Sequence, residues 1–178
     1  MTPEYSAKPP AVSANGWLAF AVALVVVLVD QGSKAWIVHG LHLHLYESIR
    51  LLPVLSLTGV HNIGVTFGML RADTVAGRSM LSLFALAVVV VLALWGRRAE
   101  RRLMAVAFGL VIGGAIGNNL IDRVRLGYVI DFIDVSGLGF FPWVFNVADV
   151  CIDVGVGLLA IDALWPRAKA SAHAAPET

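Results

Sequence analysis

Two long stretches of this sequence carry no charged side chain. They cover residues 79–96 and 103–121, and a helix of about 20 apolar residues is what a membrane core of roughly 30 Å requires. The whole chain agrees, because 58% of its 178 residues are hydrophobic, 14% are charged and the mean hydropathy is +0.81. Such a composition excludes a soluble globule and a disordered chain. We therefore expect an integral membrane protein.

Two further stretches complete the predicted set of spans, although each carries charge. Residues 17–38 are apolar except for Asp30 and Lys34. Because this stretch exceeds the ~7–15 apolar residues of a cleavable signal peptide, we expect it to be retained as a helix. Residues 146–165 carry three aspartates but are otherwise apolar, and Pro166 follows them as a stop signal. The sequence thus predicts an all-α membrane protein with four transmembrane helices.

We expect residues 1–178 to form a single membrane-embedded domain. Residues 1–15 and 168–178 are small, polar and proline-bearing, which is typical of disordered tails. The one cysteine, Cys151, cannot close an internal disulfide bond.

The short connection between the second and third spans predicts the orientation. Residues 97–102 contain four arginines, and basic loops stay on the cytoplasmic side. With four spans, both termini then lie in the cytoplasm, and the long connections 39–78 and 122–145 face outward. Thirteen Lys and Arg against twelve Asp and Glu give a net charge of +1, so we expect no nucleic-acid partner.

On this topology, polar residues from distant parts of the sequence fall at one depth, near the outer interface. A charged side chain costs ~2.5–3.5 kcal/mol or more at the bilayer centre, so ionisable residues in spans are candidates for function. The polar residues at this depth are Asp30, Gln31, Ser33, Lys34, Asn62, Asn118, Asn119, Asp122, Arg123, Asp131, Asp134, Asn146, Asp149 and Asp153.

Asp131 and Asp149 form the most informative pair in this set. They follow the third span and begin the fourth, separated by a loop short enough to let them meet. Two carboxylates held close in a poorly hydrated site share one proton. The ionised member can then take a proton from an attacking water while the protonated member polarises a peptide carbonyl. The structural alternative is that either aspartate caps a helix or pairs with Arg123 or Arg125.

Other groupings favour structural explanations. Ser33 beside Lys34 suggests a serine nucleophile with its base, but adjacent helical residues point about 100° apart. The spacing of Lys34 from Asp30 suits an ion pair on one helix face. His42 and His44 would share a face of a strand over residues 41–46, yet without further nearby ligands we predict no metal site.

A pattern of small residues recurs in the third span. Residues 113–117 read Gly-Gly-Ala-Ile-Gly, a small-xxx-small pattern that predicts close packing against a neighbouring helix.

Five short blocks follow one another along the chain. They are Asp30-Gln-Gly-Ser-Lys34; Asn62-Ile-Gly64 with Phe67 and Gly68; the block from Gly113 to Arg123; Val129-Ile-Asp131-Phe132; and Phe145-Asn-Val-Ala-Asp149. In this order and on four spans, they resemble the lipoprotein signal peptidases, also called signal peptidase II, which are bacterial membrane aspartic peptidases.

The resemblance implies roles for particular residues. Asp131 and Asp149 would be the catalytic dyad, without metal or cofactor. The residues that would shape the site or support the dyad are Asp30, Lys34, Asn62, Gly64, Asn119, Asp122, Arg123 and Asn146.

The resemblance also implies a substrate and a setting. The substrate would be a prolipoprotein with a diacylglyceryl-modified cysteine, cut just before that cysteine, and the antibiotic globomycin would inhibit the reaction. The enzyme would be a monomer among the lipids of the bacterial inner membrane, with its site near the periplasmic face. A small β-sheet cradle, matching residues 41–46 and 54–60, and a short extramembrane helix would lie on that side.

One block departs from the family pattern. The family reads GGAxGNxxDR, whereas this chain has one residue more, with Asn118 and Asn119 adjacent. The spacing to Asp122 favours Asn119 as the functional asparagine, and the step from Gly117 favours Asn118. We assign the role to Asn119.

Two other classes of protein compete with the peptidase. A small proton-coupled transporter subunit would use intramembrane acids as a relay, but it would spread them across the bilayer, and here only Asp162 lies near the inner side. A membrane assembly protein would explain the glycine pattern but leaves the two convergent aspartates without a purpose.

Overall fold

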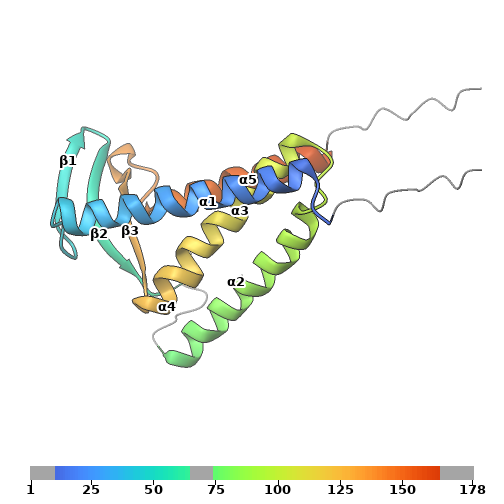
Figure 1. The fold of residues 1–178 in the computed structure, drawn as a ribbon. Coiled ribbons are helices and arrows are strands. Elements are labelled where there is room, and N and C mark those ends of the chain that lie inside the picture. Colours follow the sequence, from blue (N-terminus) through green and yellow to red (C-terminus); the bar gives the residue numbers. More distant parts are fainter. Residues whose placement is uncertain (1–10, 65–73, 165–178) are drawn as a thin grey trace, which may run out of the picture.

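Helices form the body of the protein, and a small sheet covers one end of it. The structure, a computed structural model, describes residues 11–64 and 74–164. The long helices are α1 (Ala14–Ala35), α2 (Val75–Gly96), α3 (Arg102–Ala115) and α5 (Val147–Leu164). A π-helical turn continues α1 as η1 (Trp36–Gly40), and another continues α3 as η3 (Ile116–Asp122), which runs into α4 (Arg123–Arg125). Figure 1 shows α2 diverging from the others toward the end that carries the sheet.

Within the described residues, three helices are long and apolar enough to cross a membrane by length and composition. They cover residues 14–40, 75–96 and 102–125, so each extends a predicted span by a few residues. The fourth predicted span corresponds to α5, which has 18 residues and carries three aspartates. The prediction of a membrane protein is confirmed, whereas the fourth span stays a prediction.

Helix α3 lies at the centre of the bundle, between α1 and α5. Its glycines let neighbouring backbones approach closely: a methyl group at Gly113 would lie 2.6 Å from Cβ of Val26 on α1, and one at Gly114 would lie 2.6 Å from the carbonyl oxygen of Ala148 on α5. The packing predicted for residues 113–117 is therefore confirmed.

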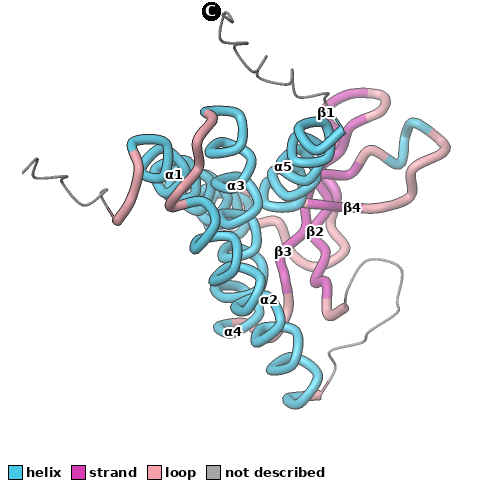
Figure 2. The backbone as a smooth tube through the Cα atoms, turned by 90° about the vertical axis from the view of Figure 1, so that its right-hand side faces the viewer, coloured by secondary structure: helices cyan, strands magenta, loops and turns pink. Residues whose placement is uncertain are grey.

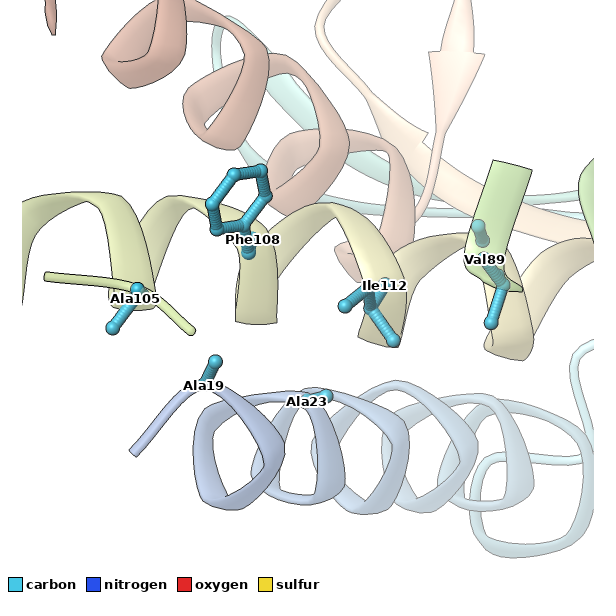
Figure 3. Close-up of a cluster of buried hydrophobic side chains, with 8 residues drawn as sticks. Ala19, Ala23, Val89, Ala105, Phe108 and Ile112 are labelled. Atoms are coloured by element: carbon cyan, nitrogen blue, oxygen red, sulfur yellow. The ribbon is translucent and has the colours of Figure 1, made fainter. Parts of the chain in front are cut away.

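Small side chains also dominate the buried core of the bundle. Figure 3 shows Ile112 of α3 pointing toward the side where Ala19 and Ala23 of α1 lie, with Ala105 nearby, while the ring of Phe108 points away from α1. Because alanines leave room for helix backbones, the larger Phe108 fills the remaining volume.

The sheet is antiparallel with strand order β1-β2-β3-β4. Its strands are β1 (Ser48–Leu52), β2 (Leu55–Asn62), β3 (Val129–Asp134) and β4 (Val144–Phe145), with a 3₁₀ turn, η4 (Ser136–Leu138), beside them. In Figure 2 the strands gather to one side of the helices. The predicted sheet is thus present, and this 3₁₀ turn is the helical segment that accompanies it among the described residues.

The strand predicted for residues 41–46 is wrong. Within this segment, Leu45 forms a single isolated bridge with Gly59. His42 and Tyr46 adopt positive φ angles of 51° and 66°, a conformation that bends the chain and interrupts a strand.

The end of the bundle opposite the sheet brings the start of α1, the α2–α3 connection and the end of α5 together (Figure 1). The backbone N–H of Ser13 donates to the carbonyl of Arg97 at 2.9 Å, and Asn15 Nδ2 donates to the carbonyl of Glu100 at 2.7 Å. Arg101 and the buried Asp162 form an ion pair.

These contacts correct part of the predicted N-terminal tail. Residues 13–15 are ordered because Ser13 caps α1 by accepting from the N–H of Gly16 at 2.9 Å. The rest of that tail through residue 10, the C-terminal tail, and Phe67 and Gly68 of the second sequence block lie outside the described residues.

Candidate functional site

Asn146 joins the two aspartates of the predicted pair. Its side-chain Nδ2 donates to Oδ1 of Asp131 on β3 at 2.6 Å. Its backbone N–H donates to Oδ2 of Asp149 at 3.1 Å, and its own Oδ1 accepts from the N–H of Asp149 at 3.0 Å. This reciprocal pair of bonds is a capping box that begins α5. The start of α5 and the middle of β3 are thereby held together.

Two more asparagines complete the surroundings of the pair. Asn62, the last residue of β2, donates from Nδ2 to Oδ2 of Asp131 at 3.0 Å. Asn118, in η3, donates from Nδ2 to Oδ1 of Asp149 at 2.8 Å. Each carboxylate therefore accepts hydrogen bonds from neutral amide groups, and no cation forms a salt bridge with either of them among the described residues.

The two aspartates differ in their surroundings. Asp131 is 2% exposed, whereas Asp149 is partly accessible. Burial raises the pKa of Asp131 to about 7, and the nearby charge of Asp149 adds to this rise, while hydrogen bonds from Asn62 and Asn146 oppose it. Asp149 lies in the first turn of α5, where the helix dipole favours a negative charge. The raised pKa of Asp131 therefore favours a proton on that carboxyl group near neutral pH.

Lys34 lies at the centre of a second polar cluster. Its Nζ donates to Oδ2 of Asp30 at 2.8 Å and to Oδ1 of Asn118 at 2.7 Å, and it lies 2.7 Å from Oδ2 of Asp122. All four residues are buried. Because an ammonium group has three protons, these three acceptors use the whole donor capacity of Lys34.

The same cluster connects to α5 and includes a residue that sequence reasoning missed. Oδ1 of Asp30 accepts from the backbone N–H of Ala148 at 3.1 Å, so α1 helps to cap α5. Gln31 donates from Nε2 to Oδ2 of Asp30 at 3.1 Å and to Oδ1 of Asp122 at 2.8 Å. The available signal for Gln31 was its place inside the first sequence block.

Gly117 permits the close approach of η3 to Asp30. A methyl group at Gly117 would lie 2.6 Å from Oδ2 of Asp30, which is closer than packed atoms allow. A larger residue would therefore push η3 away from the lysine cluster.

The two adjacent asparagines have different partners. Asn118 contacts Lys34 and Asp149, whereas Asn119 accepts from Nε of Arg123 at 3.3 Å through Oδ1 and from Ser82 of α2 at 2.9 Å through its carbonyl. The hydrogen bond to the dyad is thus made by Asn118, whereas the supporting role assigned to Asn119 from the sequence stays a prediction. The physical reason is the π-helical turn η3, whose wider winding accommodates an extra residue and turns neighbouring side chains to different sides.

Arg123 and Gly64 lie on the side of the site that faces α2. Arg123 donates from a terminal nitrogen to the carbonyl of Gly64 at 3.1 Å, and the N–H of Gly64 donates to Oδ1 of Asn62 at 3.0 Å. Arg123 is thus connected to Asp131 by hydrogen bonds through Gly64 and Asn62, and its charge also interacts with that of Asp131.

Several alternatives from the sequence lose their support. The hydroxyl of Ser33 donates to the carbonyl of Asp30 at 2.8 Å, and Lys34 is directed elsewhere, so these two residues do not form a nucleophile–base pair. Asp134 accepts from Thr58 at 2.8 Å and from the N–H of Ser136 at 2.9 Å, apart from the dyad. Within the described ranges, no group of three or more His, Cys, Asp or Glu residues is placed to hold a metal ion.

The fold and this cluster define a class of protein, namely a membrane protein with two aspartates brought together at one end of a helical bundle. Comparisons with known proteins then identify the family. A sequence model of the family described as signal peptidase (SPase) II matches residues 22–165. The chain is 51% identical over 162 residues to the lipoprotein signal peptidase of Caulobacter vibrioides, which covers 91% of this chain and 95% of that protein.

Further relatives agree with this result. The lipoprotein signal peptidase of Methylorubrum extorquens is 41% identical over 150 residues, 84% of this chain and 87% of that protein. A bacterial membrane enzyme solved by the in meso method superposes with a TM-score of 0.74 at 28% identity, over 88% of this chain and 93% of its own. The chain belongs to the signal peptidase II family, as the five sequence blocks predicted, and is a peptidase of the membrane.

Proposed function

We propose that this chain is a membrane aspartic endopeptidase that uses Asp131 and Asp149 to remove the signal peptide of prolipoproteins. Membership of the signal peptidase II family assigns the removal of a signal peptide to it and replaces the transporter and assembly hypotheses. The observation that carries the catalytic assignment is the bridge made by Asn146, which bonds to both carboxylates at 2.6–3.1 Å. The substrate is a prolipoprotein whose cysteine bears a diacylglyceryl group, and cleavage falls just before that cysteine.

The surroundings of each aspartate suggest its part in the reaction. Asp149 takes a proton from water as the water oxygen attacks the scissile carbonyl carbon. Asp131, whose raised pKa lets it hold a proton near neutral pH, donates to the carbonyl oxygen and stabilises the developing tetrahedral diol. Asp149 then passes its proton to the amine nitrogen as the C–N bond breaks, and the diol returns a proton to Asp131. Water and two carboxylates complete the cycle with no cofactor.

Helix α5 completes a four-span topology in this proposal. Its 18 residues extend about 27 Å at 1.5 Å per residue, close to the thickness of the hydrocarbon core. Two of its three aspartates have polar partners rather than lipid around them. Asp149 lies in the polar cluster, and Asp162 pairs with Arg101 at the other end of the helix. The arginine-rich connection at that end supports a cytoplasmic location for it and for both termini.

The dyad consequently lies near the periplasmic face of the inner membrane. A lipidated signal peptide is itself a membrane segment, so its cleavage point reaches a site at this depth while its acyl chains remain in lipid. The enzyme works as a monomer among membrane lipids, and globomycin-type inhibitors compete for the same site.

The test is cleavage of a diacylglyceryl-modified substrate by purified enzyme. Asp131→Asn and Asp149→Asn should each lower kcat by at least roughly 10²–10⁴-fold, the usual contribution of a positioned acid or base. Asp134→Asn and Asp153→Asn serve as matched controls, because they remove a carboxylate outside the bridge, and both should keep nearly full activity. Folding is checked by thermal unfolding in detergent.

Retained cleavage in either dyad variant contradicts the aspartic mechanism. Cleavage that is lost in Ser33→Ala but kept in both dyad variants supports the serine hypothesis instead.

A further inference from the structure

A pocket of about 570 Å³ lies between α2 and the η3–α4 segment. Its polar lining includes Arg78, Ser79 and Ser82 of α2 together with Arg123, and its apolar lining includes Leu83 and Leu86. The pocket is distinct from the dyad, because neither Asp131 nor Asp149 lines it. Among the lining residues that the structure describes, two carry guanidinium groups and none is acidic.

The two arginines are held in place but retain donor capacity. Nε of Arg78 donates to the carbonyl of Thr74 at 3.5 Å, and its terminal nitrogens lie against Gly127, where a side chain would clash with them. Arg123 is 5% exposed, and one of its terminal nitrogens, NH1, has no hydrogen-bond partner among the described residues. A buried guanidinium nitrogen without an acceptor is costly, so an anionic ligand near these side chains would be stabilising.

The walls of the pocket belong to the lipid-facing surface of the bundle. Leu83 is 64% exposed and Val124, another lining residue, is 65% exposed. Both lie on helices that are long and apolar enough to cross a membrane. The polar part of the pocket lies toward the start of α2, and Arg123 connects it to the candidate site. In the bilayer this places two positive charges near the interface and the apolar walls beneath them.

We propose that this pocket binds one anionic phospholipid, with its phosphate between Arg78 and Arg123. Guanidinium groups bind phosphate oxygens through paired, charge-assisted hydrogen bonds, and basic pockets between transmembrane helices bind anionic headgroups. Ser79 and Ser82 offer hydroxyl donors to the remaining headgroup oxygens. An acyl chain packs along Leu83 and Leu86.

The bound lipid connects α2 to the segment that carries Arg123. Arg123 also contacts Asn119 and Gly64, so the lipid holds α2 at the edge of the polar site. This inference goes beyond the peptidase activity, and binding is measured without substrate. Failure of the catalytic proposal would leave it intact.

The experiment is native mass spectrometry of the purified full-length protein in detergent, titrated with single lipids. The probes are three lipids with the same acyl chains. Dioleoyl phosphatidylglycerol has an anionic headgroup, dioleoyl phosphatidylcholine has a zwitterionic headgroup, and dioleoylglycerol has no phosphate. We expect one tightly bound phosphatidylglycerol, weaker binding of phosphatidylcholine and no specific binding of dioleoylglycerol. Arg78→Gln should weaken the binding of phosphatidylglycerol by roughly tenfold, because it loses one charge-assisted contact.

The matched control is Arg125→Gln, which removes an exposed arginine of α4 outside the pocket and should leave the affinity unchanged. Leu83→Trp fills the apolar half and should also weaken binding, whereas Leu94→Trp, near the other end of α2, should not. If Arg78→Gln does not fold, the comparison of Leu83→Trp with Leu94→Trp still tests whether the lipid binds in this pocket. Equal affinity in wild type, Arg78→Gln and Leu83→Trp overturns the proposal. Displacement of the lipid by millimolar inorganic phosphate also overturns it, because the site would then bind free phosphate.

Discussion

Two pairs of aspartates lie side by side at one end of this protein, and they are stabilised in opposite ways. Asp30 and Asp122 share a cation, because Lys34 contacts both at 2.7–2.8 Å. Asp131 and Asp149 share a neutral side chain, because Asn146 bonds to both. Asn118 touches the two pairs at once, accepting from Lys34 and donating to Asp149.

The difference separates structural carboxylates from reactive ones. A carboxylate that forms an ion pair with an ammonium group within a buried cluster contributes to the position of the helices that carry the two charges. A carboxylate that is buried among amides keeps a raised pKa and can bind and release a proton near neutral pH. In the proposed mechanism, the lysine cluster holds α1, η3 and α5 in place, and the asparagine-held aspartates perform the chemistry.

The largest effect is expected from Lys34→Met. This change leaves Asp30 and Asp122 buried without their cation, which costs about 3–5 kcal/mol of unfolding free energy. Denaturant unfolding in detergent micelles measures it. The comparison variant is Asp131→Asn, which removes no salt bridge.

The pH dependence of Asp131→Asn sharpens this contrast. Because the pKa of Asp131 is about 7 when folded and 3.8 as its ordinary value, the folded state binds more protons between these values, and stability falls as pH rises through this window. An asparagine at position 131 does not titrate, so the variant does not lose stability in this window. Its free energy of unfolding should match that of the wild type at low pH and exceed it at pH 8. If Lys34→Met unfolds no more readily than Asp131→Asn, the division between the two clusters is wrong.

A tenfold or larger difference in activity is expected between Asn118→Ala and Asn119→Ala. Asn118 orients Asp149, so its loss should reduce kcat by about 10–100-fold, in line with the loss of groups that orient a reactive ligand. Asn119 contacts Arg123 and Ser82, so its loss should cost less. The measurement is kcat on a diacylglyceryl-modified substrate with matched thermal stability. A larger loss in Asn119→Ala would restore the assignment made from the sequence.

The sequence was sufficient for three of the four predicted spans and for the polar residues that the structure gathers around Asn146. Uncharged stretches predicted the helices within a few residues, because hydrophobic length alone determines whether a helix can cross a membrane. The pairing of Asp131 with Asp149 followed from their positions at the same end of consecutive segments. These predictions depend on spacing and depth, which a sequence displays directly.

Other features depended on local backbone geometry, which the sequence does not display. The choice between Asn118 and Asn119 required the π-helical turn η3, since an α-helical turn would direct them differently. The false strand over residues 41–46 had an alternating pattern, but the left-handed conformations of His42 and Tyr46 interrupt it. Gln31 was missed because its two carboxylate partners lie on different helices.

The smallest expected effect is a shift in the alkaline limit of activity. In the proposed mechanism catalysis requires protonated Asp131, so activity should decline as pH rises above about 7, the pKa of that carboxyl. The hydrogen bond from Asn62 lowers this pKa because it stabilises the ionised form. Asn62→Ala should therefore raise the pKa of Asp131 and move the alkaline limit upward by roughly one pH unit. A charge-assisted hydrogen bond contributes about 1.5–3 kcal/mol. Because Asn62 is half-buried, water replaces part of the lost hydrogen bond in the variant.

The matched control for this shift is Thr58→Ala on the same strand. Thr58 donates to Asp134 at 2.8 Å rather than to the dyad, so its loss should leave the alkaline limit in place even if it lowers stability. The readout is the pH at half-maximal kcat on the alkaline side, which a general loosening of the sheet would not raise. An alkaline limit that stays fixed or moves downward in Asn62→Ala means that Asp131 is not the group that must be protonated. The roles of Asp131 and Asp149 would then be reversed, and the contrast between the amide-held pair and the lysine-held pair would have to rest on stability alone.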